Sequence, residues 1–152
     1  MMFLGTVLNR ILPPILVALH ALLLGWAVVG LAEWFLLDVP WPAVSNELFP
    51  RWLLLLHWLS VFGASLLFLL GYLLKWKRTP VLMIPAYSFM AIVCTIETIF
   101  FLTHPLRYVA MVLEYIAYVA IPLALLRLPS FVRHFQGSEF DPGDPGARQE
   151  IK

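Results

Sequence analysis

The chain has 152 residues, of which 62% are hydrophobic and only 12% charged, and its mean hydropathy is +0.89. This composition is typical of a polytopic membrane protein. A net charge of +1 provides no positive field for nucleic acid, which is therefore excluded as a main partner. The single cysteine, Cys94, allows no internal disulfide and no zinc knuckle, and the sequence predicts neither a metal site nor a cofactor.

Four apolar stretches are each long enough to cross the ~30 Å hydrocarbon core of a bilayer as a helix rising ~1.5 Å per residue. The first is too long for a signal peptide and lacks its small-residue cleavage site. We therefore predict an all-α bundle of four transmembrane helices. Pro13 and Pro14 should lie in the first turn of the first helix, where a missing N–H costs little. The predicted spans are roughly 11–37, 52–74, 81–103 and 106–128.

The charges of the connecting segments predict the orientation of the bundle. The short connection at 75–80 carries three basic residues, whereas 38–50 carries two acids and no Lys or Arg. Basic loops stay in the cytoplasm, so both termini should be cytosolic. Residues 136–152 are too polar and too rich in Pro and Gly to pack. The sequence thus predicts one membrane domain, 1–135, followed by a disordered cytosolic tail.

Each span places one ionisable side chain in the non-cytoplasmic half of the predicted bundle. At ~1.5 Å per residue, all four lie within about 6–12 Å of the same membrane surface. A charge at membrane depth costs a few kcal/mol, so it is kept where protein partners or a wet cavity receive it. The four residues are Glu33, His57, Glu97 and Glu114. We expect Glu33, His57 and Glu97 to line one enclosed cavity.

A purely structural interpretation exists for most of these groups. Glu33 could reach the membrane interface, and His57 could be a packing residue whose hydrogen bonds are satisfied. Glu114 could bond to Tyr118 one turn away or to Arg107. Glu97 is the hardest to explain in this way, because apolar residues flank it on both sides. The small residues of Gly63-Ala64-Ser65 predict close approach of a neighbouring helix.

Aromatic residues near these ionisable groups would suit a flat or cationic ligand. Their faces attract cations and offer flat surface to an apolar ring system. Two carboxyl groups in one low-dielectric cavity resist joint ionisation, which leaves one net negative charge for a ligand ammonium. The aromatic candidates are Trp34, Trp58, Tyr115 and Tyr118.

Several stretches follow one another along the chain: NELFP at 46–50, KWKRTPVLMIPAYSFM at 75–90 and YIAYVAIPLALL at 115–126. The basic turn followed by a Tyr-Ser pair, at 75–90, is the most specific of them. In this order they resemble members of the EXPERA-domain family, the family of the sigma-2 receptor and, more distantly, of the sterol isomerase called emopamil-binding protein. Together the similar region covers about 33–130.

The resemblance implies a four-helix bundle in the endoplasmic reticulum, with a pocket that opens toward the bilayer and receives sterols and cationic amphiphiles. A homodimer would fit the family. In this family an acid in the first helix pairs with the ligand amine, and an acid in the second helix supports it. Glu33 matches the first acid in placement. The second span here carries His57 and no carboxylate, so Glu97 would take over the supporting role from another helix.

The sequence therefore favours an intramembrane binding protein for a sterol or another apolar ring ligand, or for a cationic amphiphilic amine. One alternative is a sterol double-bond isomerase, in which Glu97 and His57 would be the catalytic proton carriers. Another is a small structural subunit of a larger membrane-protein complex.

Overall fold

The computed structural model describes residues 2–36 and 49–136, and describes side chains from residue 9 onward. All elements in these ranges are helices. The predicted tail from residue 137 onward, and most of the first connection, lie outside the described residues. The elements are α1 (Met2–Leu36), α2 (Arg51–Leu73), α3 (Thr79–Ile96), the π-helical segment η1 (Glu97–Phe101), α4 (Arg107–Arg127) and α5 (Pro129–Gln136).

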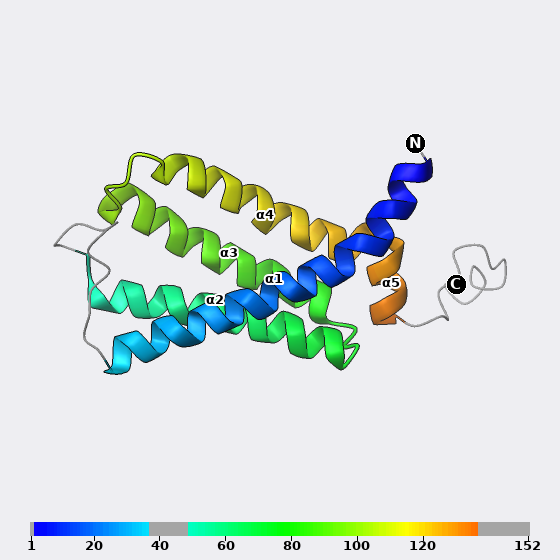
Figure 1. Ribbon diagram of the computed structural model, residues 1–152, viewed down its shortest axis with the longest axis horizontal. Coiled ribbons are helices and arrows are strands. Elements are labelled where there is room, and N and C mark those ends of the chain that lie inside the picture. Colours follow the sequence, from blue (N-terminus) through cyan, green and yellow to red (C-terminus); the bar gives the residue numbers. More distant parts are fainter. Residues whose placement is uncertain (1, 37–48, 137–152) are drawn as a thin grey trace, which may run out of the picture.

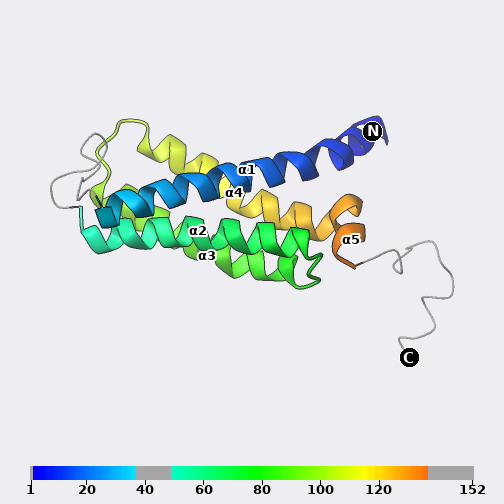
Figure 2. The ribbon, with the colours of Figure 1, turned by 60° about the horizontal axis from the view of Figure 1, so that its bottom comes forward.

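Four helices are long and apolar enough to cross a membrane, as predicted, and the protein is an integral membrane protein by this criterion. Their candidate spans are Asn9–Leu36, Arg51–Leu73, Thr79–Phe101 and Arg107–Arg127, so the predicted bounds are correct to within two residues. Neighbours in the chain are neighbours in space: α1 packs on α2, α2 on α3 and α3 on α4 (Figures 1 and 2). The orientation of this bundle in a membrane stays a prediction.

Both ends of the bundle differ from the prediction. α1 begins at Met2, so Pro13 and Pro14 lie inside the helix and not in its first turn. Each proline removes one helical hydrogen bond and favours a bend, and the first third of α1 turns away from the rest (Figure 1). The sequence also did not predict α5, which lies across the end of the bundle and packs on α4 and α1 (Figure 2).

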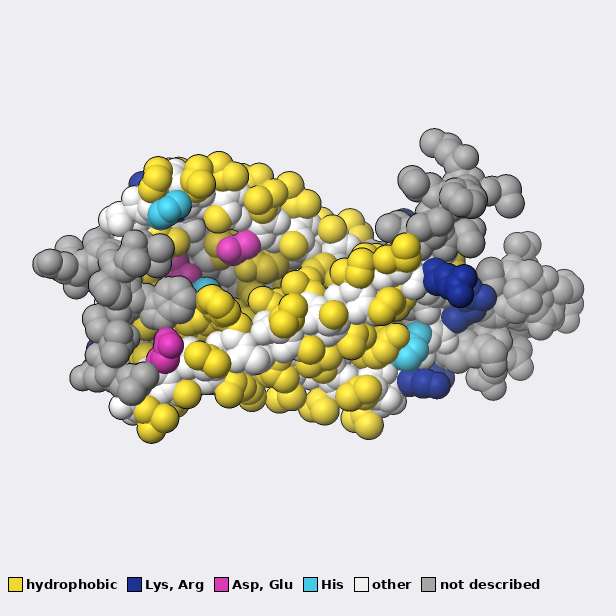
Figure 3. Space-filling model, viewed as in Figure 1, with side chains coloured by type: hydrophobic (Ala, Val, Ile, Leu, Met, Phe, Trp, Pro, Cys, Tyr) yellow, Lys and Arg dark blue, Asp and Glu magenta, His cyan; other side chains and the backbone are white. Residues whose placement is uncertain are grey.

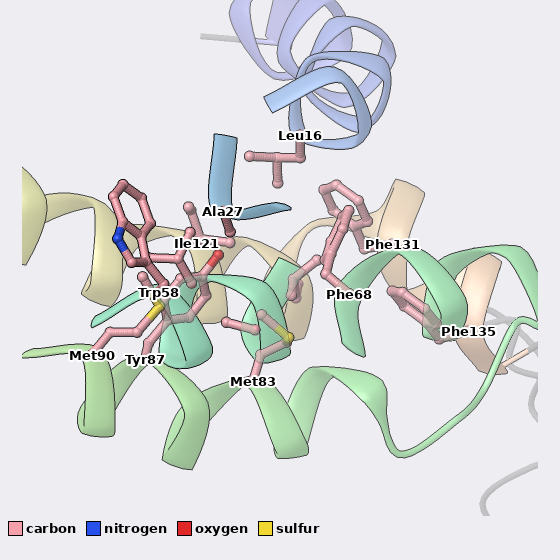
Figure 4. Packing of buried hydrophobic residues seen from close by; sticks show 13 residues of the cluster. Leu16, Ala27, Trp58, Phe68, Met83, Tyr87, Met90, Ile121, Phe131 and Phe135 are labelled. Carbon is pink, nitrogen blue, oxygen red and sulfur yellow. The ribbon is translucent and has the colours of Figure 1, made fainter. Parts of the chain in front are cut away.

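The apolar core continues from the spans into α5. Phe68 of α2 and Phe131 and Phe135 of α5 are almost fully buried, and they belong to one cluster with Leu16 and Met83 (Figure 4). Burial of two phenylalanines is enough to hold a helix of only eight residues, which would be marginal by itself. α5 therefore closes one end of the bundle.

Two glycines let adjacent helices approach closely. Gly30 of α1 lies against the indole ring of Trp58 in α2, and Gly71 of α2 lies against the side chain of Thr79 in α3. A Cβ atom at either glycine would overlap the neighbouring side chain. In lipid the hydrophobic effect does not drive helices together, because the surrounding acyl chains are also apolar. Close helix contacts of this kind therefore provide much of the packing energy of the bundle.

The small-residue run in α2 packs only in part. Ala64 and Ser65 are buried, as predicted. A Cβ atom at Gly63 would meet nothing within 4 Å, so the prediction of close approach at this glycine is wrong. The contact falls to its neighbours because successive helix residues point about 100° apart.

A buried polar contact joins α1 to α3 near the middle of the bundle. His20 Nδ1 donates to Leu16 O at 2.7 Å, and Tyr87 Oη donates to His20 Nε2 at 2.7 Å. The imidazole also stacks on Phe68, with ring centroids 3.9 Å apart. Both ring nitrogens thus have partners, and His20 is a structural residue.

Tyr87→Phe tests this contact because it leaves His20 Nε2 buried without a donor. We expect the free energy of unfolding in detergent to fall by about 1.5 kcal/mol, within the range for an unsatisfied buried group. Tyr108→Phe is the control, since Tyr108 is half exposed and should lose little. His20→Leu combined with Tyr87→Phe should recover part of the loss. A double variant as unstable as the sum of both changes would contradict the account.

α2 ends in a tight turn in which Lys75 has a left-handed backbone conformation, with φ 50°. Trp76 N donates to Gly71 O at 2.8 Å and Lys75 N to Tyr72 O at 3.2 Å. These two bonds form a Schellman motif, whose left-handed position is usually glycine. A residue with a Cβ atom costs ~1–2 kcal/mol in this conformation. The basic turn predicted from the sequence is therefore compact but strained at Lys75.

Lys75→Gly should relieve this strain and raise the free energy of unfolding by about 1 kcal/mol. Thermal unfolding of the purified protein in detergent measures the change. Lys77→Gly removes the same charge from the same turn at a residue without a left-handed backbone, and should not stabilise the protein. Equal stabilisation by both substitutions would assign the effect to charge and not to backbone strain.

Candidate functional site

A hydrogen-bonded pair of ionisable side chains joins α2 to the α3–η1 helix. His57 Nδ1 donates to Glu97 Oε2 at 2.9 Å. The side chain of Glu97 is 9% exposed and that of His57 is 35% exposed. The other carboxyl oxygen, Glu97 Oε1, is buried and has no hydrogen-bond partner within the described part of the chain. One oxygen of the carboxyl group is therefore held in place while the other can accept a further bond.

Local backbone geometry places Glu97 at a change of helix type. α3 ends at Ile96 and continues as η1, in which Leu102 N donates to Glu97 O at 2.8 Å, a spacing of five residues. Such π-helical turns are rare and occur frequently at functional sites. The hydrophobic pattern of the sequence did not reveal this turn, although it did identify Glu97.

Two adjacent side chains of α2 point to different helices. His57 contacts Glu97 on the α3 side, whereas the indole of Trp58 is 3% exposed and fills the space beside Gly30 of α1. The two rings meet edge to face, with centroids 4.9 Å apart. Trp58, predicted as a ligand-binding residue, is thus part of the α1–α2 contact and supports the position of His57.

Glu114 brings α4 into the same group of side chains. It is exposed on the protein surface, and Tyr118 Oη donates to Glu114 Oε2 at 3.0 Å, which confirms the predicted contact one turn away. Glu114 interacts electrostatically with His57 and Cys94. The Tyr118 hydroxyl interacts in the same way with Glu97. We call Glu97, His57, Glu114 and Tyr118 the acidic cluster.

Arg107, the alternative partner considered for Glu114, does not bond to it. Arg107 donates instead to Leu102 O and to Tyr108 Oη, and its guanidinium lies over the Tyr108 ring. The negative charge of Glu114 is therefore not neutralised by this arginine.

The sequence analysis did not identify the buried Thr98, whose Oγ1 lies 3.9 Å from Cys94 Sγ, one helical turn earlier. Residues four apart on a helix are neighbours, so their spacing in the sequence could have indicated this contact.

The acidic cluster lies in the half of the bundle opposite most of the basic residues. Figure 3 shows acidic and histidine side chains along a hollow between α4 and α1, with most Lys and Arg at the other end. α1 and α4 flank this face without the extensive packing that joins α1 to α2 or α3 to α4. Glu114 of the cluster is exposed and His57 is partly exposed, whereas Glu97 is buried beneath them.

Glu33 and Trp34 lie near the end of α1, closer to that end of the bundle than the acidic cluster. Trp34 Nε1 donates to Arg51 O at 3.2 Å, and the Arg51 guanidinium lies 5.5 Å from the centre of the indole. Arg51 precedes His57 by six residues, about 9 Å along a helix. Glu33 is half-buried at this outer level, in the same half of the bundle as the cluster.

Tyr115 connects α4 to α3, and its ring lies beside that of Tyr118, with centroids 6.4 Å apart. Its hydroxyl bonds to Thr95 Oγ1 and donates to Ala91 O at 3.3 Å. The structure therefore brings together Glu97, His57, Glu114 and Tyr118 of the predicted site residues. It places Trp34, Trp58 and Tyr115 in helix–helix contacts.

Within residues 2–36 and 49–136, no group of three or more His, Cys, Asp or Glu side chains is placed to hold a metal ion. The chemistry available to the acidic cluster is hydrogen bonding, attraction of a cation, and proton transfer between Glu97 and His57. Comparison of the chain with protein-family models, with curated proteins and with solved structures finds no match. Membership of the EXPERA-domain family therefore stays a prediction.

Proposed function

We propose that the protein binds a sterol or another apolar ring lipid, or a cationic amphiphile, within the membrane, with the polar end of the ligand at Glu97. One observation carries the proposal: Glu97 Oε1 is buried and unbonded, while His57 holds Oε2. Leaving a buried acceptor unsatisfied costs ~1–3 kcal/mol. A ligand ammonium or hydroxyl at Oε1 would recover this energy.

The charge of the acidic cluster favours a cation. With a protonated histidine and two ionised acids, His57, Glu97 and Glu114 carry a net charge of −1. The same net charge results if the histidine is neutral and the acids share one proton. The phenol of Tyr118 offers an aromatic face beside these groups. An amphiphilic amine would place its ammonium in this cluster and its apolar body along the open face between α1 and α4.

The resemblance to the EXPERA-domain family adds the remaining parts of the proposal. It suggests that the ligand is sterol-like, that the protein resides in the endoplasmic reticulum, and that two copies associate. It also suggests Glu33 as an acid that contacts the ligand. The half-buried position of Glu33 in the same half of the bundle is compatible with this role.

Saturable binding of a radiolabelled lipophilic tertiary amine to the purified protein in nanodiscs tests the proposal. We expect one high-affinity site per chain, and competition by a neutral sterol that shares the apolar part of the site. A permanently neutral analogue of the amine, with the nitrogen replaced by carbon, is the matched control and should bind more weakly. Amine binding that does not saturate, or that equals partition into empty nanodiscs, would refute the proposal.

Sterol double-bond isomerisation is the second candidate, because the 2.9 Å contact between His57 and Glu97 joins two groups that can exchange a proton. In such a reaction one proton is added to a ring carbon and another is lost from a nearby carbon, so the sterol keeps its composition. Incubation with an unsaturated sterol in D₂O should then give a shifted double bond and one deuterium. If the sterol is unchanged and amine binding is saturable, the isomerase function is refuted and only the binding function is supported.

A further inference from the structure

A separate recess lies at the opposite end of the bundle from the acidic cluster. It is open to the outside, has a volume of ≈ 590 Å³ and is formed between the first turns of the α1 span and the last turns of α4. Its walls are apolar except for one arginine. The lining residues are Leu12, Ala120, Leu123, Ala124, Arg127 and Leu128.

Small side chains on α4 and a fixed helix end account for the recess. Ala120 and Ala124 are one turn apart and share a face of the helix, so they leave space where larger residues would fill the surface. Ser130 Oγ donates to Asn9 Oδ1 at 3.3 Å, which ties the start of α5 to α1. The recess is thus framed by α1, α4 and the α4–α5 junction.

Arg127 gives this apolar recess a positive charge at one edge. Its side chain is exposed, and no described carboxylate forms an ion pair with it. The acids of the described chain, Glu33, Glu97 and Glu114, lie in the other half of the molecule. Other basic side chains gather at the same end as Arg127 (Figure 3). A ligand that covers this recess must therefore be apolar along its length and anionic at the end next to Arg127.

We propose that the recess binds an acyl chain of an anionic phospholipid, with the phosphate of the head group at Arg127. A guanidinium can bond two phosphate oxygens at once, and basic pockets between transmembrane helices recognise anionic head groups. Ala120 precedes Arg127 by seven residues, about 10 Å along the helix. An acyl chain that leaves the head group at Arg127 would therefore pass over both alanines toward the middle of the bilayer.

Native mass spectrometry of the purified protein with added lipid tests this site. Phosphatidylglycerol and phosphatidylcholine with identical acyl chains are compared: both carry the phosphate, but the choline cation of phosphatidylcholine cancels its charge, so only phosphatidylglycerol is anionic. We expect one phosphatidylglycerol to be retained about tenfold more strongly than phosphatidylcholine. Arg127→Gln should reduce its retention to the level of phosphatidylcholine. Lys77→Gln removes the same charge at the same end, in the turn between α2 and α3, and should change little.

A second substitution tests the recess independently of charge. Ala120→Phe fills the space beside Ala124 while Arg127 is kept, and it should also lower phosphatidylglycerol retention about tenfold. Thermal unfolding verifies that each variant is folded, and Ala120→Leu replaces any Ala120→Phe protein that is not. Equal retention of both lipids by the unaltered protein would overturn the proposal. So would equal losses in Arg127→Gln and Lys77→Gln, which would indicate diffuse charge attraction without a site.

Discussion

Glu97→Gln should weaken the binding of a lipophilic amine by about 1–3 kcal/mol, the scale of a charge-assisted hydrogen bond. This corresponds to a roughly 5- to 150-fold rise in Kd. The amide keeps the size of the side chain and can still accept a bond from His57, so the helix contact should survive. A neutral sterol should bind almost as before, because it does not need the negative charge. Radioligand binding in nanodiscs measures both ligands.

Two further substitutions act as comparisons for Glu97→Gln. Glu114→Gln removes a carboxylate that is exposed and bonded to Tyr118, and we expect a smaller loss of amine affinity. Glu33→Gln tests the acid suggested by the family resemblance. A larger loss with Glu33→Gln than with Glu97→Gln would move the amine site to the end of α1. Unchanged amine affinity in all three variants would refute the amine site and favour the alternative that the protein is a structural subunit.

Gly30→Val should lower the free energy of unfolding by about 3 kcal/mol, at the upper end of the range for overpacking a well-packed site. Even a single Cβ atom at this position would overlap the Trp58 indole, which is held between α1 and the His57 ring. The variant must therefore separate α1 from α2 or displace the indole. Unfolding in detergent micelles measures the loss, and amine binding should weaken with it because Trp58 supports His57.

Gly25→Val is the matched control for Gly30→Val. Gly25 lies in the same helix, and a Cβ atom there would meet nothing within 4 Å, so this variant should be nearly as stable as the unaltered protein. Gly30→Val combined with Trp58→Ala should recover part of the loss, because the smaller residue makes room for valine. Equal losses for Gly25→Val and Gly30→Val would show that valine acts through helix propensity and not through the indole contact.

The length of each apolar run was sufficient to predict the four spans, because a run of about 20 predominantly apolar residues is typical of a transmembrane helix. The same criterion could not predict α5 (Pro129–Gln136). That helix is short and carries Arg133 and His134, and it depends on the tertiary burial of Phe131 and Phe135. The early start of α1 was missed for a related reason: two adjacent prolines normally mark the beginning of a helix.

The acidic cluster could be predicted in part from membrane depth. Counting residues from the span ends placed His57, Glu97 and Glu114 at one level, and the structure brings them together. Depth does not determine the rotation of a helix about its own axis. For this reason the sequence could not show that Trp58 turns to α1 while His57 turns to α3. The π-helical turn after Ile96 was also unpredictable, since it depends on a single local change in hydrogen bonding.

A structure of the protein with a bound lipophilic amine would test the central claim most directly. A heavy atom, such as bromine, in the apolar part of the ligand would mark that end and so distinguish it from the ammonium end. We predict that the ammonium nitrogen lies ~2.7–3.2 Å from Glu97 Oε1, with His57 still bonded to Oε2 and the apolar part between α1 and α4. An ammonium bound elsewhere, with Glu97 Oε1 turned to a protein donor or to lipid, would contradict the account.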